Sequence, residues 1–322
     1  MRSILLSVIV PVFNSDKFLQ DALNCLKKQT CNNIEFLIVN DGSIDNSLEI
    51  IKRFCEHDKR FTCISKSQNS GYGQSCNLGI LKSSGQYIAF FEPDDLIPDD
   101  FYEILLEKAR DTQVPDVIKY NGIYSFDTFG VENRVFQMKD FPNSIFDKDE
   151  YPRFWRTHPA IVNAIYKKDF LVKNNLCFPE SAGASYQDVQ FLTSLYYGRP
   201  KLLIVDFCKY KYRRHPDQSV QKPGVGIEQR VIQNWEYLFD EILSETNQQD
   251  MWFALIQMYR QFCTMSKKFP DTKFEQFNIF FSQQVWKYGM VRPVRLKWFA
   301  LNNKEMMRFY FLFAKGFFKF LF

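Results

Sequence analysis

The sequence predicts an α/β fold with a doubly wound, mostly parallel sheet and a C-terminal helical extension. Strand-like and helix-like segments alternate four times in about 95 residues, which is typical of a parallel sheet with helices on its faces. The chain has 322 residues, of which 46% are hydrophobic, so it can bury a sizeable core. Its length suits one large domain with an extension, or two modest domains.

Continuous apolar runs predict the strands of the first half, and amphipathic segments predict its helices. We expect strands at 5–12, 34–39, 61–65 and 87–91. We expect helices at 17–29, from a cap at Asp45 or Ser47 through Phe54, and at 75–81.

The second half is less regular. We expect a helix at 101–110, strands at 117–120 and 202–207, and loop with a short helix at 127–150. Residues 158–166 fit either a strand or the start of a helix, and residues 220–285 have a largely helical pattern.

Cysteine usage and hydropathy predict where the protein works. The eight cysteines include no Cys-x-x-Cys pair and no metal-ligand spacing, which suits a reducing compartment. No stretch reaches about 18 consecutive apolar residues, so we expect no transmembrane helix. The apolar start of the chain lacks the cleavage site of a signal peptide. The sequence therefore predicts a cytoplasmic protein.

Three carboxylates follow the fourth predicted strand. The apolar run 87–91 leads into Glu92, Pro93, Asp94 and Asp95, and Pro93 cannot donate to a sheet ladder. Ligands bind at the carboxyl ends of strands in open α/β sheets. Crowded acids repel one another unless a cation lies among them, and hard divalent cations prefer oxygen ligands. The cluster predicts a metal site, with a solvated acidic turn as the alternative.

Polar residues also follow the first two predicted strands. Asn14 and Asp41 would therefore line the same sheet edge as the acidic cluster. The loop after the first strand has no G-x-G-x-x-G pattern, and the chain has no P-loop. A nucleotide at this edge would be held without either glycine loop.

Five motifs along residues 4–100 together resemble family 2 glycosyltransferases. They keep the order and approximate spacing of that family. They are Ser7–Asn14, Gln29-Thr30, Asn40–Ser47, Asn69-Ser70-Gly71 with Asn77-Leu78-Gly79, and Glu92-Pro93-Asp94-Asp95.

The resemblance implies a glycosyltransferase A-type fold, an inverting mechanism, and a nucleotide-sugar donor held with Mn²⁺ or Mg²⁺. Two departures from the family pattern are Asn40 in place of Asp and Glu92 in place of Asp. The residues implied for donor binding are Pro11, Val12, Asn14, Asp41, Asn69, Gly71, Asn77, Asp94 and Arg213, and those for metal are Glu92, Asp94, Asp95 and His215.

Asp188 is the expected catalytic base. Inverting transfer needs a group that takes the proton of the acceptor hydroxyl, and a carboxylate on the first turn of a helix is well placed for it. The family commonly has Glu-Asp here, whereas this chain has Gln187-Asp188. The alternative is that Asp188 only charges a helix start.

A basic stretch follows the strand predicted at 202–207. Tyr210, Tyr212, Arg213 and His215 resemble a Tyr-x-Tyr-Arg-x-His pattern of the family, whose basic end lies near the diphosphate. Arginine suits phosphate oxygens and neutral imidazole can bind a metal. A solvated basic turn is the alternative.

The positive charge is concentrated at the C-terminal end. Residues 286–322 hold eight basic side chains and one acidic, a charge of +7, whereas the whole chain carries +4. Lys304, Arg308, Lys315 and Lys319 share one helical stripe among many aromatic residues. This predicts binding to an anionic membrane surface, peripheral on the inner face of the plasma membrane. The alternatives are docking on the catalytic domain or on a second subunit, as in a homodimer. We expect no nucleic-acid partner.

The sequence thus predicts an inverting, metal-dependent glycosyltransferase that moves a sugar from a nucleotide donor, a UDP-sugar, to a glycan or lipid-linked glycan acceptor. Residues 1–115 would form the nucleotide-sugar-binding half, 116–219 the acceptor-binding half, and 220–322 the helical extension. The alternative enzyme is a sugar-phosphate nucleotidyltransferase, which should carry a Gly-rich, basic loop after the first strand; this chain lacks that loop. A degenerate glycan-binding or assembly subunit remains the non-enzyme alternative, because Asn40, Glu92 and Gln187 depart from the family pattern.

Overall fold

The computed structural model describes residues 5–110, 114–127, 130–142, 144–147, 150, 160–184, 186–206, 210–218, 226–242, 248–269 and 274–289. The chain divides into two compact units, residues 1–238 and 239–322. The first unit holds the sheets and the predicted site residues.

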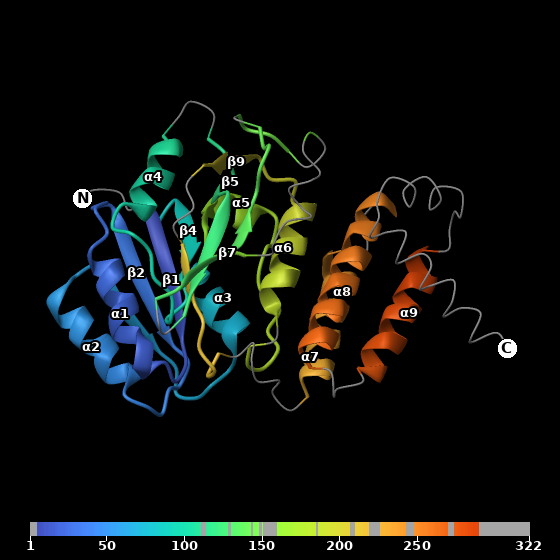
Figure 1. Cartoon of the computed structure of the whole chain (residues 1–322), viewed down its shortest axis with the longest axis horizontal. Helices are drawn as coiled ribbons and strands as arrows, with labels where there is room; N and C mark the ends of the chain where they lie inside the picture. Colours follow the sequence, from blue (N-terminus) through green and yellow to red (C-terminus); the bar gives the residue numbers. More distant parts are fainter. Residues whose placement is uncertain are drawn as a thin grey trace. The chain divides into compact units, whose positions relative to one another are not determined.

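A seven-stranded sheet forms the centre of the first unit, in the order β3-β2-β1-β4-β8-β5-β9 (Figure 1). Its strands are β1 (Leu6–Val12), β2 (Ile34–Asn40), β3 (Phe61–Ser65), β4 (Tyr87–Phe90), β5 (Val117–Tyr120), β8 (Ala164–Lys167) and β9 (Leu202–Val205). All strand pairs are parallel except those that β8 makes with β4 and β5. The predicted mostly parallel sheet is confirmed.

Helices alternate with the strands as expected. They are α1 (Asp16–Lys27), α2 (Ser47–His57), α3 (Tyr72–Lys82), α4 (Phe101–Lys108), α5 (Lys168–Lys173), α6 (Gln187–Tyr197) and α7 (Ile227–Tyr237). α3 packs closely on β1, because a Cβ at Gly79 would lie 2.4 Å from Cγ2 of Ile9. The glycine of the Asn77-Leu78-Gly79 motif is therefore a packing requirement.

The expectation of loop and a short helix over residues 127–150 is wrong where the structure describes them. β7 (Glu132–Gln137) pairs antiparallel with β6 (Gly122–Phe126), and β10 (Lys211–Arg213) pairs parallel with β6. No residue of β7 is buried, so the strand has no apolar run that would reveal it. β7 forms because its backbone pairs with β6. An ion pair of 2.5 Å between Lys211 of β10 and Glu132 of β7 supports this sheet.

An aromatic cluster fixes the segment before α6 against the sheet. The rings of Phe178 and Phe191 are stacked with centroids 4.2 Å apart, and Phe90 of β4 contacts both at 5.0 and 5.7 Å. All three side chains are buried. The start of α6 is thereby attached to the strand that leads into the acidic cluster.

β1 holds a proline near its carboxyl end. The ladder between β1 and β4 runs from Leu6 to Ile9, opposite Phe90, and Pro11 lies two residues beyond its end. Its missing N–H therefore leaves no sheet hydrogen bond unmade on this side. The two strands stop pairing where the predicted ligand edge begins.

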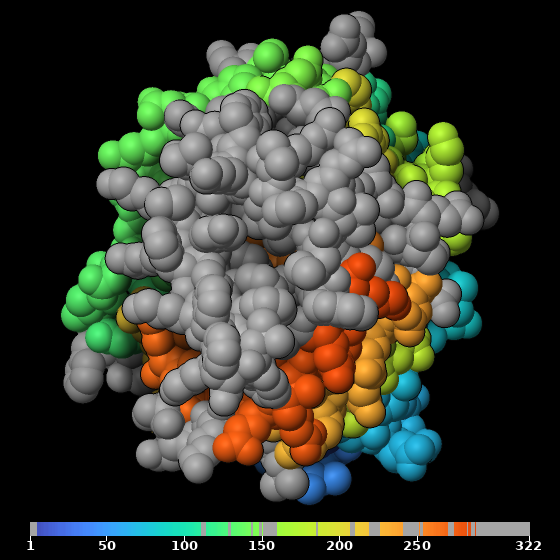
Figure 2. Space-filling model, turned by 90° about the vertical axis from the view of Figure 1, so that its right-hand side faces the viewer, coloured from blue at the N-terminus to red at the C-terminus, as the bar shows by residue number. Residues whose placement is uncertain are grey.

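The described residues of the second unit are largely helical. α8 (Gln248–Lys268) and α9 (Glu275–Gly289) pack against each other; they are coloured orange and red in Figure 2. The rings of Phe262 and Phe277 stack with centroids 5.5 Å apart. The predicted C-terminal helices are confirmed. In the described residues no helix is both long enough and apolar enough to cross a membrane. Residues 290–322 of the predicted membrane-binding tail lie outside the described residues.

Candidate active site

Three loops interlock at the carboxyl ends of β1, β2 and β3. Asn14, in the left-handed region with φ of 49°, accepts a hydrogen bond from Ile44 N at 2.9 Å. Its own N–H donates to Ser43 Oγ at 3.1 Å. A Cβ at Gly42 would lie 2.5 Å from the Gln68 carbonyl carbon. We call residues 13–16, 40–47 and 66–71 the three-loop edge.

Asp41 organises the three-loop edge from within. Its side chain is 4% exposed, and its Oδ1 lies 2.6 Å from Lys66 Nζ. The backbone N–H groups of Ser70 and Gly71 donate to Oδ1 and Oδ2, each at 2.9 Å. Lys66 also donates to the hydroxyls of Ser70 and Ser75. Asp41 therefore holds the third loop closed, and its Oδ2 keeps capacity for one more donor.

The start of α3 packs on the segment before α6. Asn77 donates to Phe178 O at 2.9 Å and to Glu180 Oε1 at 3.1 Å, and it accepts from Phe178 N at 2.8 Å. Its amide is thus engaged by protein groups. Gly71 has φ of 108° and lies so close to Ser181 that a Cβ would be 2.7 Å from that carbonyl oxygen. Asn69, in the same loop, is exposed.

Glu92 turns toward α3. Its Oε1 accepts a hydrogen bond of 2.7 Å from the Tyr72 hydroxyl. The pKa of Glu92 is raised to about 8, chiefly by burial; the hydrogen bond from Tyr72 lowers it, and the nearby charges of Asp94 and Asp188 contribute to the rise. The carboxylates of Glu92, Asp94 and Asp188 therefore lie within electrostatic range of one another.

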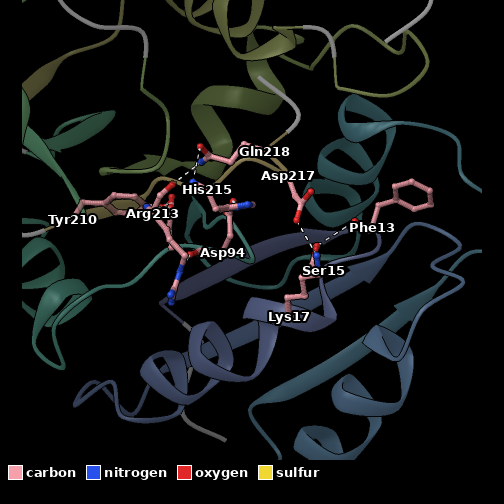
Figure 3. Close-up of polar contacts among 10 residues, drawn as sticks. Phe13, Ser15, Lys17, Asp94, Tyr210, Arg213, His215, Asp217 and Gln218 are labelled. Atoms are coloured by element: carbon pink, nitrogen blue, oxygen red, sulfur yellow. Dashed lines mark hydrogen bonds and ion pairs between the residues drawn. The ribbon is translucent and has the colours of Figure 1, made fainter. Parts of the chain in front are cut away.

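Asp94 faces His215 (Figure 3). The Nε2 atom of His215 lies 2.9 Å from Asp94 Oδ2. Arg213 donates from Nε to the Asp94 carbonyl at 2.8 Å, and its guanidinium lies over the rings of Phe18 and Phe126, 5.1 and 4.9 Å from their centroids. Arg213 therefore stabilises the loop that holds Asp94 by donating to the backbone carbonyl of Asp94.

Both carboxylate oxygens of Asp95 accept hydrogen bonds from protein groups. Asp95 is fully buried; its Oδ2 accepts from the Tyr210 hydroxyl at 2.6 Å and its Oδ1 from Arg213 N at 2.9 Å. Burial raises the pKa of Asp95 well above its usual range, with the Asp94 charge adding to the rise. The second carboxylate of the Asp94-Asp95 pair therefore anchors the segment 210–213.

The four residues expected to bind metal are not gathered around one point. Only Asp94 and His215 are brought together, while Glu92 and Asp95 point to Tyr72 and Tyr210. Within the described ranges, no group of three or more His, Cys, Asp or Glu side chains could share a metal ion.

Asp188 stands in the first turn of α6, as predicted. Burial raises its pKa from 3.8 to about 6, although the N–H groups of Asp188 and Val189 stabilise its ionised form and oppose the shift. At neutral pH the carboxylate is therefore mostly ionised while it remains a better base than an exposed aspartate.

Sequence reasoning missed four residues that build the site. Lys66, Tyr72, Phe18 and Gln218 lie in no position that the motifs single out, although Tyr72 follows Asn69-Ser70-Gly71 directly. Gln218 is buried, donates to Arg213 O at 2.6 Å and accepts from His215 N at 3.4 Å (Figure 3). No sequence signal separates these residues from ordinary polar or aromatic ones.

Comparisons with known proteins identify the family and the fold. The family model described as "Glycosyl transferase family 2" matches residues 7–171, about half of the chain. EpsH of Bacillus subtilis (strain 168), named as a glycosyltransferase, is 29% identical over 69% of this chain and 64% of its own length. This chain thus matches less than two thirds of that relative.

Two solved structures share the fold. S. aureus TarS 1-349, in complex with UDP-GlcNAc, has a TM-score of 0.64 at 17% identity over 88% of this chain and 80% of its own. The mannosyltransferase PcManGT from Pyrobaculum calidifontis, in complex with GDP-Man and Mn²⁺, has a TM-score of 0.50 at 13% identity over 87% of this chain and 84% of its own.

The three-loop edge and the acidic residues after β4 lie within the matched residues 7–171. The same range contains strands β2 to β8 and nearly all of β1. The fold is that of the glycosyltransferase A-type structures. The chain therefore belongs to glycosyl transferase family 2.

Proposed function

We propose that this chain is an inverting glycosyltransferase that uses a divalent metal ion to move a sugar from a nucleotide-diphosphate donor, a UDP-sugar, to a hydroxyl of a surface glycan. The observation that carries the proposal is the convergence of Asp94, Glu92 and Asp188. Two of these acids follow β4 and the third begins α6, yet the charges of Asp94 and Asp188 both act on Glu92.

Asp94 and His215 are the proposed metal ligands. A carboxylate oxygen and an imidazole nitrogen form a donor set that Mn²⁺ accepts, and two protein ligands leave positions for diphosphate oxygens and water. Because a carboxylate only accepts, the 2.9 Å contact with Asp94 places a proton on His215 Nε2 in this structure. A metal ion bound between the two residues would take the place of that proton, and the buried Nδ1, which has no hydrogen-bond partner in the described residues, could carry the proton of the neutral ring. The metal would neutralise negative charge on the leaving diphosphate.

The three-loop edge is the proposed nucleotide site. Pro11, Val12 and Asn14 would bound it on one side, and Asn69 and Gly71 on the other. Asp41 would accept a hydrogen bond from the base through Oδ2, since among the described residues that oxygen receives only the Gly71 N–H. The named complexes of TarS with UDP-GlcNAc and of PcManGT with GDP-Man and Mn²⁺ support a nucleotide-sugar donor with a metal.

Asp188 is the proposed base. As the acceptor oxygen forms its bond to the anomeric carbon, the bond from that carbon to the diphosphate breaks. The acceptor proton passes to the Asp188 carboxylate, and the diphosphate leaves with the bonding electron pair. Attack opposite the leaving group inverts the anomeric configuration.

The basic C-terminal stretch supports a membrane-associated acceptor. Residues 286–322 carry a charge of +7 among many aromatic residues, which favours an anionic lipid surface. Removing residues 303–322 should reduce binding to vesicles that contain anionic lipid. Unchanged binding would count against this part of the proposal.

The donor can be identified by thermal unfolding with nucleotide diphosphates and nucleotide sugars, each with Mn²⁺, Mg²⁺ or EDTA. We expect stabilisation by uridine compounds that depends on the metal, and slow metal-dependent hydrolysis of the matching nucleotide sugar. Stabilisation by none of the compounds would favour a degenerate subunit that binds or assembles glycan.

A further inference from the structure

The start of α6 is held by the preceding residues 178–184 and 186, which the structure describes and which belong to no helix or strand. Tyr186 precedes α6 in the left-handed conformation, with φ of 60°, and its carbonyl accepts from Val189 N at 3.1 Å. A tyrosine in this conformation is strained, so neighbouring contacts must hold it. The direction in which Asp188 leaves the helix depends on those contacts.

α3 holds the far side of this segment. A Cβ at Gly73 would lie 2.0 Å from the Pro179 carbonyl oxygen, which shows how closely the two backbones approach. Tyr72 N donates to Gly183 O at 3.1 Å. The loop 181–183 therefore lies directly against the start of α3, next to the Gly71 that bonds Asp41.

Gln187 closes the loop from the α6 side. Its side chain is buried, and Nε2 donates to Ser181 O at 3.3 Å, Ser181 Oγ at 3.0 Å and Gly183 O at 3.0 Å. Gly183 thus accepts from both Tyr72 N and Gln187 Nε2. The Gln187 side chain therefore joins the loop 181–183 to the first turn of α6, one residue before Asp188.

The amide is the part of Gln187 that this arrangement requires. Two of the three oxygens around Nε2 are carbonyl oxygens, which can only accept. A glutamate of the same shape has no N–H to offer when ionised, and its charge would face those oxygens. A Glu-Asp pair at positions 187 and 188 would therefore place a carboxylate against the carbonyl oxygens of Ser181 and Gly183, to which the glutamine amide donates.

We infer that Gln187 is the positioning residue for Asp188: its amide fastens the loop 181–183 to α6 and so fixes the carboxylate relative to the three-loop edge. The inference rests on the proposed function, because Asp188 is the base of the proposed transfer. It explains a departure from the family pattern that otherwise counts toward a degenerate protein.

The test compares Gln187→Glu and Gln187→Met with wild type. The first variant replaces the donor by an acceptor, and the second removes it without adding charge. We expect kcat to fall roughly 10–100-fold in both, because a misplacement of about 1 Å has that effect, while the metal-dependent stabilisation by UDP stays near the wild-type value. Gln86→Glu is the matched control, since Gln86 is exposed before β4, at the other end of the strand, and should behave as wild type.

Two further readouts separate positioning from loss of fold. The acidic limb of the pH–kcat profile should move to higher pH in Gln187→Glu, where a new charge precedes Asp188, and should stay in place in Gln187→Met. Amide hydrogen exchange should accelerate in 178–188 in both variants and remain slow in β1 and β2. If Gln187→Glu does not fold, Gln187→Met alone decides.

Wild-type kcat together with unchanged exchange in 178–188 would overturn the inference. A wild-type protein that transfers no sugar would count against the proposed function instead. In that case the exchange of 178–188 still decides whether Gln187 holds the loop.

Discussion

The Nε2 atom of His215 lies 2.9 Å from Oδ2 of Asp94, although 121 positions separate the two residues. Asp94 follows β4 of the seven-stranded sheet, and His215 follows β10 of the three-stranded sheet. The pair therefore forms only when both sheets are folded together.

Replacing either member of this pair should abolish metal-dependent stabilisation by nucleotides. In wild type a ligand at 100 times its Kd stabilises the fold by about 2.7 kcal/mol. We expect Asp94→Ala and His215→Ala to lose most of this gain, as measured by thermal unfolding with Mn²⁺ and UDP. His57→Ala, on the exposed end of α2, is the control and should keep it. A full Mn²⁺ effect in Asp94→Ala would remove Asp94 from the metal site.

Asp188→Asn should abolish transfer and leave donor binding intact. Because the pKa of Asp188 in the folded protein is about 6, the wild-type kcat should rise with pH through this value as the base loses its proton. Near-normal turnover in Asp188→Asn would refute its role as base.

The same substitution should stabilise the fold at neutral pH. The folded-state pKa of about 6 lies above the usual 3.8, so the folded protein holds this proton more tightly than the unfolded chain. Ionisation therefore destabilises the fold as pH rises from 3.8 to 6, by about 1–3 kcal/mol in full. Urea unfolding should show Asp188→Asn more stable at pH 7.5 and equal to wild type below pH 4. Asp169→Asn, exposed in the first turn of α5, should show no such gain.

Tyr210→Phe should destabilise the protein in the absence of metal. It removes the 2.6 Å hydrogen bond to the fully buried Asp95. Leaving a buried polar group without its partner costs about 1–3 kcal/mol. Urea unfolding in EDTA measures the loss. Tyr237→Phe is the control, because the Tyr237 side chain is more exposed and its hydroxyl contacts a weak partner, Cys177 Sγ, at 3.1 Å; it should change stability by less than about 0.5 kcal/mol. Equal stability of Tyr210→Phe and wild type would show that Asp95 needs no such anchor.

Gly71→Ala should be more damaging than Gly130→Ala. Both glycines have positive φ, 108° and 77°, but only at Gly71 would a Cβ meet backbone, 2.7 Å from Ser181 O. We expect about 1–2 kcal/mol of conformational strain at Gly130 and about 1–3 kcal/mol at Gly71, whose φ of 108° and ψ of 159° lie in a region essentially restricted to glycine. Overpacking adds about 1–3 kcal/mol at Gly71. Thermal unfolding measures the difference. Equal losses would mean that the loop at 181 moves aside freely.

The sequence was sufficient for the sheet and for the residues at strand ends. Apolar runs such as 5–12 and 61–65 appear as β1 and β3, because buried parallel strands need continuous apolar residues. The placement of Asp41 and Asp94 at one edge follows from the same alternation of strands and helices. The residues that meet at this edge directly follow the strands that carry them, so locating the strands also locates these residues.

The partners of these residues could not be predicted from the sequence. Asp94 and Asp95 are adjacent and chemically identical, yet one faces His215 and the other is buried against Tyr210. Which of the two faces the site depends on how β10 packs, and nothing near residue 94 encodes that. β7 was missed for a related reason: its side chains are not buried, and only pairing with β6 makes it a strand.

The position of β8 has a consequence for how the protein folds. β8 inserts between β4 and β5, with Ile88 opposite Tyr166. During synthesis β1 to β4 emerge first, and the apolar edge of β4 stays open until the residues of β8 follow, some 75 positions later. Such contacts between distant segments slow folding, and an open edge can pair with other chains. A nascent chain stalled before residue 164 should therefore aggregate through β4, and chaperones that cover strand edges would act within this interval.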